Sequence, residues 1–270
     1  MNTKSLDLLG LILAPAAFVL IALSLNVSSV PLIAWLMVIA GVMLLIWLWV
    51  HETRHPDSIL ELKAFRAASF RRGMLVSWIQ YIALNGSIVF IPQYLQNFKG
   101  YSPFQAGLVM SMLAVTSGLL MPVGGRLFDR IGIRPLASAG LGIIALALTL
   151  LSRMNMNADG VLITGVVGLL GIGMGLCMMS LNTYILQSAP RESISRVTPL
   201  ISASSNLIIP LSIAGLSQFM RIRINTRAGV PGIDAPLAEL AAYADTFLLA
   251  ACIAVFGALF SLWLTGKRQR

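Results

Sequence analysis

The sequence predicts an all-α integral membrane protein, because its composition and its apolar runs both fit a chain whose main solvent is lipid. Of the 270 residues, 57% are hydrophobic and only 11% are charged, whereas soluble domains carry about 25% charged residues. Eight apolar stretches approach the roughly 20 residues that span a bilayer as a helix. A chain in lipid must satisfy its backbone hydrogen bonds internally, which favours about eight transmembrane helices over any open sheet.

The expected helices divide the chain into three regions. They cover, in order, residues 6–25, 30–50, 74–97, 104–125, 133–152, 160–187, 196–219 and 245–265. Residues 1–50 therefore hold two transmembrane helices, 51–73 form a charged linker, and 74–270 hold six more helices. The first stretch also has the charged start of a signal peptide at Lys4, but its length and the charge of Asp7 favour a transmembrane helix.

Lysine and arginine counts orient the chain. With a cytoplasmic N-terminus, 14 of the 19 basic residues fall in inside segments and 5 fall outside. Cytoplasmic loops carry an excess of Lys and Arg, so we expect a multi-pass protein of the cell (inner or plasma) membrane with both termini cytoplasmic. The net charge of +9 does not predict a nucleic-acid partner, since the basic residues are spread over short loops.

The linker 51–73 alternates charged and apolar residues and predicts an amphipathic helix on the inner membrane face. Its first five residues, 51–55, match the H-E-x-x-H pattern of zinc proteases. Pro56 follows directly, and a residue before proline is pushed out of helical geometry. Because the chain has only two His, a third zinc ligand would have to be Asp57, Glu61, Asp129 or Glu192. We favour a chance match and predict no metal site, with a membrane zinc protease as the alternative.

Polar residues inside the predicted helices mark a candidate cavity. Such side chains are costly against lipid and should face protein or a water-filled space. The candidate cavity-lining residues are Gln80, Tyr81, Asn85, Tyr94, Asn182, Tyr184, Ser205 and Asn206. The alternative is that these groups only form hydrogen bonds between helices. In the stretch 74–97, Pro92 also predicts a bend near the outer end.

The stretch 160–187 is rich in glycines, several of which lie three or four residues apart. They are Gly165, Gly168, Gly171, Gly173 and Gly175. A nucleotide-binding loop would need a preceding strand and the spacing G-x-G-x-x-G, and the sequence offers neither. Small residues allow membrane helices to approach closely, so we expect this helix to pack tightly against its neighbours.

A polar hairpin between the stretches 104–125 and 133–152 is the most distinctive loop. It carries Gly125, Arg126, Asp129, Arg130, Gly132 and Arg134. The glycines allow a sharp turn, and Asp129 is expected near the N-terminus of the next helix, where a carboxylate is favoured. The simplest interpretation is a basic cytoplasmic turn that only sets the topology.

The same loop resembles the signature of major facilitator transporters, G-x-x-x-D-R-x-G-R-R, with Ile133 in place of one basic residue. The order of all segments is similar to the C-terminal portion of the fourteen-helix drug:proton antiporter branch, the multidrug efflux permeases. In that branch two linker helices precede the second six-helix half. Pro92-x-Tyr94-Leu95-Gln96 and the Ser188-Ala189-Pro190-Arg191 loop also fit, whereas Pro210 and the preceding isoleucines replace an expected glycine pair.

The resemblance implies a secondary transporter and no enzyme, in which two six-helix halves rock about a central site. The glycine–aspartate–arginine loop would act as a conformational latch, the proton gradient would supply the energy without a cofactor, and the substrates would be small lipophilic, often cationic compounds. No acidic residue lies at mid-membrane in the last six helices, although a proton-coupled pump needs one. Besides the lipid bilayer, we therefore expect a missing N-terminal half or a second transporter chain as partner, and no pumping by this chain alone. The alternative is a membrane-embedded interaction subunit without transport.

Overall fold

The computed structural model describes residues 67–154, 158–189, 194–228 and 235–264, together with the isolated positions 36, 39–41, 43, 44, 47 and 65. The two helices expected in 1–50, the amphipathic linker helix and the H-E-x-x-H pattern lie outside this part of the chain, apart from those positions.

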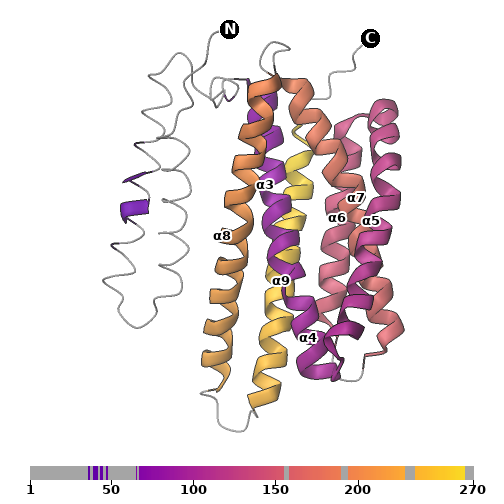
Figure 1. Cartoon of the computed structure of the whole chain (residues 1–270), viewed down its shortest axis with the longest axis vertical. Coiled ribbons are helices and arrows are strands. Elements are labelled where there is room, and N and C mark those ends of the chain that lie inside the picture. The colour runs from indigo at the N-terminus through magenta and orange to yellow at the C-terminus, as the bar shows by residue number, and fades with distance from the viewer. Residues whose placement is uncertain are drawn as a thin grey trace.

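The described residues form long helices that run side by side along one axis, without a strand (Figure 1). They are α3 (Ala68–Ile88), α4 (Phe90–Lys99), α5 (Pro103–Ile131), α6 (Ile133–Ser152), α7 (Gly160–Ser188), α8 (Ile194–Ala228) and α9 (Ala235–Ser261). Within the part of the chain that the structure describes, six segments are long and apolar enough to cross a membrane, and α3 and α4 together form one of them. The predicted all-α membrane fold is confirmed for this part of the chain.

The prediction was most accurate for the two middle helices. The stretch 133–152 is α6 without change, and α7 ends one residue after the predicted 160–187. Their ends carry clear stop and start signals. Gly132 precedes α6 with a φ of 80°, and the Asp159 side chain accepts a hydrogen bond from the Val161 N–H at the start of α7.

The other helices extend beyond the predicted apolar stretches. Helix α3 begins six residues early at Ala68, and α5 ends six residues late at Ile131. Helix α8 continues to Ala228, and α9 begins at Ala235, so most of the connection expected between the stretches 196–219 and 245–265 belongs to these two helices. An apolar stretch reports the thickness of the hydrocarbon layer, whereas charged residues continue a helix beyond it.

The predicted bend at Pro92 is confirmed. Proline has no N–H for the carbonyl of the residue four positions earlier, here Ile88. Helix α3 ends at Ile88, and α4 begins at Phe90 after a one-residue interruption. Helix α4 in turn ends at Lys99 and is followed by Gly100, whose φ of 63° is left-handed.

The predicted close packing of the glycine-rich helix is also confirmed. A Cβ added at Gly175 would lie 2.6 Å from the Ser117 carbonyl oxygen of α5. One added at Gly173 would lie 2.8 Å from the Gly140 carbonyl oxygen of α6. The Thr116 hydroxyl of α5 donates a 2.9 Å hydrogen bond to the Gly168 carbonyl of α7. Helix α7 therefore approaches both neighbours at backbone distance.

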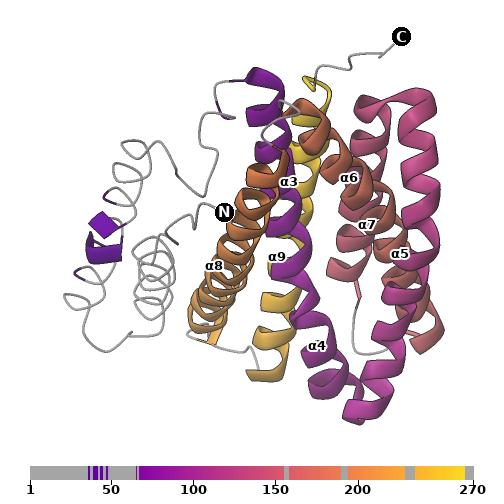
Figure 2. The ribbon, with the colours of Figure 1, turned by 45° about the horizontal axis from the view of Figure 1, so that its top comes forward.

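Helices α5 and α8 lie at opposite sides of the bundle (Figures 1 and 2). The main contacts join α5 to α7, α7 to α6, α6 to α9, and α9 and α8 to α3. In α5 and α8 only 22% of the most apolar stretch is buried within the bundle, against 39–61% in the other four spans. These two helices have the largest faces without a neighbour among the described residues.

Candidate functional site

The predicted latch loop is the end of a helix. Gly125, Arg126, Asp129 and Arg130 occupy the last two turns of α5, and Gly132 alone separates α5 from α6. The expected hairpin between the stretches 104–125 and 133–152 was wrong, because residues 126–131 continue α5. Gly132 makes the turn with a φ of 80°, which side chains disfavour.

The charges of this helix end point away from the bundle. Arg126, Asp129 and Arg130 are exposed, and none of their side chains has a hydrogen bond or ion pair to another described residue. Asp129 lies in the last turn of α5, so its expected place at the start of α6 was also wrong. Gly124 lies just before the latch residues, and a Cβ on it would lie 3.1 Å from the Gly175 carbonyl oxygen. This end of α5 is therefore packed closely against α7.

Arg134, the last latch residue, has a different environment from the other charges. It lies in the first turn of α6, and its Nε donates a hydrogen bond to the Leu264 carbonyl just beyond α9. Arg72 of α3 donates from Nη1 to the neighbouring Trp263 carbonyl at 3.2 Å. Two arginines thus satisfy carbonyls at the C-terminal end of α9, where cations are favoured. Sequence analysis placed Arg72 in the amphipathic linker and missed this contact.

The eight predicted cavity-lining residues do not share one environment. Asn85, Asn182 and Ser205 are half-buried and Asn206 is exposed, whereas the other four are buried in the bundle, namely Gln80, Tyr81, Tyr94 and Tyr184. The Ser205 hydroxyl donates to the Ser202 carbonyl of its own helix at 2.9 Å.

Tyr94 belongs to an aromatic cluster between α4 and α9. Its ring centroid lies 5.9 Å from that of Phe98 and 6.2 Å from that of Tyr243. The cluster extends to Phe90, whose ring packs edge-on against Tyr243 at 6.3 Å. Such pairs stabilise packing, and they hold the bent segment α4 against the start of α9.

Gln80 has the most unusual environment of the eight. It is 1% exposed, and its amide nitrogen has no hydrogen-bond partner among the described residues. Gln80 lies two turns after Gly73, on the same face of α3. A Cβ on Gly73 would lie 3.0 Å from the Tyr184 ring of α7. Gln80 therefore lies on the face of α3 that packs against α7. Buried polar groups are rarely left without a partner, so its amide is a candidate contact for a bound molecule.

An ion triad joins α8 to α9 at the end where α8 stops and α9 starts. Asp245 Oδ2 accepts from Arg223 Nε at 2.7 Å and from Arg227 Nη2 at 2.6 Å. Sequence analysis placed both arginines in a loop and missed this contact. Their spacing of four residues, which puts them on one helix face, was the available signal.

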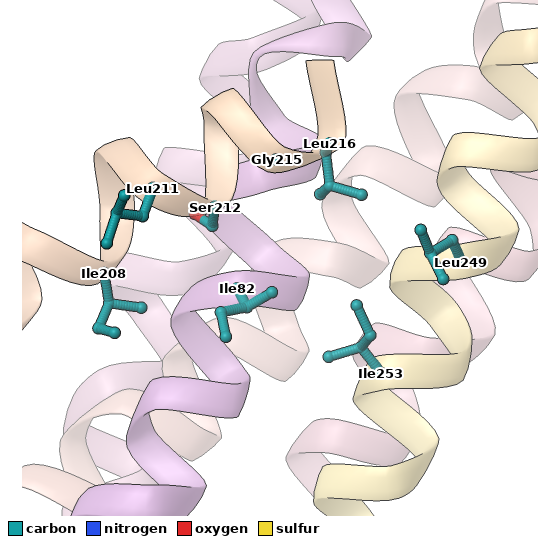
Figure 3. A pocket seen from close by; sticks show the side chains of 8 residues that line it. All are labelled: Ile82, Ile208, Leu211, Ser212, Gly215, Leu216, Leu249 and Ile253. Atoms are coloured by element: carbon teal, nitrogen blue, oxygen red, sulfur yellow. The ribbon is translucent and has the colours of Figure 1, made fainter. Parts of the chain in front are cut away.

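An apolar groove of about 400 Å³ lies between α3, α8 and α9 (Figure 3). It is lined by Ile82, Ile208, Leu211, Ser212, Gly215, Leu216, Leu249 and Ile253. None of the eight predicted cavity-lining residues is among them, so the groove is separate from the predicted cavity.

The chain is similar to proteins that are named for drug resistance or multidrug transport. The lincomycin resistance protein LmrB of Listeria innocua is 28% identical over 213 residues, which are 76% of this chain and 45% of LmrB. The multidrug transporter protein MdtP of Bacillus subtilis is 25% identical over 196 residues, or 72% of this chain and 36% of MdtP. The multidrug resistance protein Stp of Mycobacterium tuberculosis is 28% identical over 152 residues, or 56% of this chain and 28% of Stp.

This chain thus aligns with less than half the length of these relatives. A family model, described as Major Facilitator Superfamily, matches residues 5–213, which is more than three quarters of the chain. With its apolar helices and its multidrug transporter relatives, the chain is a multi-pass membrane protein that belongs to the Major Facilitator Superfamily.

Proposed function

We propose that this chain supplies one six-helix half of a proton-driven transporter that exports small lipophilic, often cationic compounds across the cell membrane. The observation that carries the proposal is that α5 and α8, at opposite sides of the bundle, are the two least buried spans. Related proteins named for multidrug and lincomycin resistance are about twice as long as the part that aligns or longer. A second helical body, on the same polypeptide or on another, would cover these two faces.

The exposed face of α5 supports this arrangement. Apolar side chains at least 38% exposed recur along it at three- and four-residue steps. They are Phe104, Leu108, Met112, Val115, Leu119 and Val123. Because the same steps lead to Arg126 and Arg130, the apolar stripe and the latch arginines share one face of the helix. A body that docks on the stripe would meet these charges at its end.

The latch would then act through contacts that differ between two states. Asp129 and the two arginines have exposed side chains on the last turns of α5. Pairing with the second body in one state alone would bias the equilibrium between inward-open and outward-open arrangements. Arg134, in contrast, is bound to the end of α9 within this bundle and would serve as a fixed anchor.

The substrate would contact the inner face of the bundle near Gln80. An amide with an unused donor in an apolar surrounding suits a neutral or basic compound that brings an acceptor atom of its own. Among the acidic residues of the described helices, Asp129 and Glu239 lie near helix ends, and Asp159 precedes α7. Asp245 lies ten residues into α9, where it is paired with two arginines. The group that carries the proton at mid-membrane would therefore come from the second body.

Export from cells tests the proposal. We would delete the locus, restore it with wild type or with Asp129→Asn, and measure the efflux of ethidium and lincomycin as probes. We expect deletion to abolish energised efflux of at least one probe, wild type to restore it, and Asp129→Asn to fail although it reaches the membrane at the normal level.

Asp159→Asn is the matched control, because it removes a charge from another helix terminus and asparagine also caps helices well. It should restore export fully. Collapse of the proton gradient with an ionophore should stop export. Unchanged efflux after deletion would favour the alternative of an interaction subunit, and full export by Asp129→Asn would refute the role of the latch.

A further inference from the structure

The groove between α3, α8 and α9 offers apolar contacts and almost no polar atom. Its lining residues lie near the middle of the three helices, at the depth of the hydrocarbon layer. The Ser212 hydroxyl, the one polar side chain in the lining, donates to the Ile209 carbonyl at 2.7 Å and is already used. Gly215 is exposed, and a Cβ added there would meet nothing within 4 Å, so the groove stays open beside it (Figure 3).

One end of this groove is charged. Asp245 lies one turn before the lining residue Leu249 on α9, and Arg223 lies two turns after the lining residue Leu216 on α8. These steps keep the ion triad on the groove faces of both helices. At 1.5 Å per residue along α8, Arg223 lies about 10 Å and Arg227 about 16 Å from the nearest lining residue, Leu216.

The triad carries a surplus positive charge. Arg223 and Arg227 both bind Oδ2 of the single carboxylate of Asp245 at 2.6 Å. One arginine would neutralise Asp245, so the second leaves a net charge of +1. The three side chains are 38%, 28% and 22% exposed in the order Arg223, Arg227 and Asp245. Since each guanidinium has five N–H donors, both retain donors for a further anion.

We propose that the groove and the triad together form a binding site for one anionic phospholipid of the surrounding leaflet. Its phosphate would lie against Arg223 and Arg227, and one acyl chain would lie in the groove. An apolar groove alone holds an acyl chain little better than neighbouring lipid does, because lipid tails are equally apolar. Selection therefore comes from the charged end, since guanidinium groups bind phosphate oxygens and basic sites between membrane helices recognise anionic headgroups.

Native mass spectrometry of the full chain, extracted in a mild detergent, tests this site. Phosphatidylglycerol and phosphatidylethanolamine would be added at equal mole fractions, and the retained lipid counted and identified. We expect one tightly retained phospholipid, with phosphatidylglycerol preferred about fivefold, which is the effect expected of one basic residue at an anionic surface.

Two pairs of variants separate the groove from the charge. Gly215→Phe should fill the groove and abolish retention, whereas Gly142→Phe, at another exposed glycine with open space around it, should retain the lipid. Arg227→Gln should make the triad neutral and remove the fivefold preference while a lipid still binds. Arg221→Gln removes the same charge from the opposite face of α8 and should keep the preference.

If Gly215→Phe retains the phospholipid as wild type does, the assignment of the groove is overturned. A headgroup preference equal in Arg227→Gln and Arg221→Gln would overturn the role of the triad. Retention of detergent alone would refute both parts. If Gly215→Phe fails to fold, the two arginine variants still decide the question, because both lie at partly exposed positions that tolerate glutamine.

Discussion

Gly171 of α7 offers the sharpest test of the packing that holds the bundle together. A Cβ at this position would lie 2.5 Å from the Leu113 carbonyl oxygen of α5 and would also collide with the Thr116 hydroxyl. That hydroxyl forms the hydrogen bond to Gly168 that joins the two helices. We expect Gly171→Ala to push α5 away from α7 and to weaken this bond.

The size of the effect follows from three contributions. Ordinary contact begins at 3.4 Å, so α5 must move by about 0.9 Å, and overpacking of this kind costs about 1–3 kcal/mol. Loss of a hydrogen bond between membrane helices costs about 0.6 kcal/mol. Alanine regains about 1 kcal/mol of helix propensity over glycine. The net loss of stability is therefore about 1–3 kcal/mol.

Gly165→Ala is the matched control in the same helix. Its Cβ would meet nothing within 4 Å, so only the gain in helix propensity remains. The two variants should differ by about 2–4 kcal/mol, or about 4–16 °C in Tm at the 2–4 °C per kcal/mol typical of chains of this size. Thermal unfolding in detergent, followed by circular dichroism, measures the difference. Equal Tm values for the two variants would refute close contact between α5 and α7.

Three further changes test other contacts. Asp245→Asn removes both ion pairs of the triad and should lower the free energy of unfolding by about 1 kcal/mol, because each partly exposed pair contributes less than that. Its Tm should therefore fall. The control Glu239→Gln changes a carboxylate whose amide contact is 3.4 Å long, and it should leave Tm nearly unchanged. Arg134→Gln should weaken the C-terminal cap of α9 by about 0.3–1 kcal/mol and should speed amide hydrogen exchange at residues 261–264. Unchanged protection of these amides would show that Arg134 does not stabilise this helix end. Pro92→Ala supplies an N–H for the Ile88 carbonyl and should join α3 to α4 in one continuous helix. The new amide at position 92 should then be protected from hydrogen exchange. Rapid exchange at this position would show that another contact causes the bend.

The features that the sequence predicted well are those determined by neighbours along the chain. Gly132 and Asp159 mark the starts of α6 and α7 through local conformation and capping, and both starts were placed correctly. Pro92 bends its helix for an equally local reason. Glycine spacing in α7 predicted close packing because the spacing itself puts the small residues in rows on the helix surface.

The features that were missed depend on which segments meet in space. Helices α5 and α8 continue through charged residues at their C-terminal ends. A prediction from runs of apolar residues stops before these charged turns. The triad links Asp245 to arginines 18 and 22 residues away, and Arg72 binds a carbonyl 191 residues away. A single sequence contains the charges but does not show their pairing.

The proposal that a second helical body covers α5 and α8 is tested most directly by photo-crosslinking in native membranes. A benzophenone amino acid would replace Leu119 of α5, which is 67% exposed, or Leu146 of α6, which is 54% exposed, and the products would be identified by mass spectrometry. We predict that position 119 forms an adduct with a helical segment outside residues 67–264, whereas position 146 forms adducts with lipid. Lipid adducts at both positions would contradict the proposal and leave α5 as a face that meets only the bilayer.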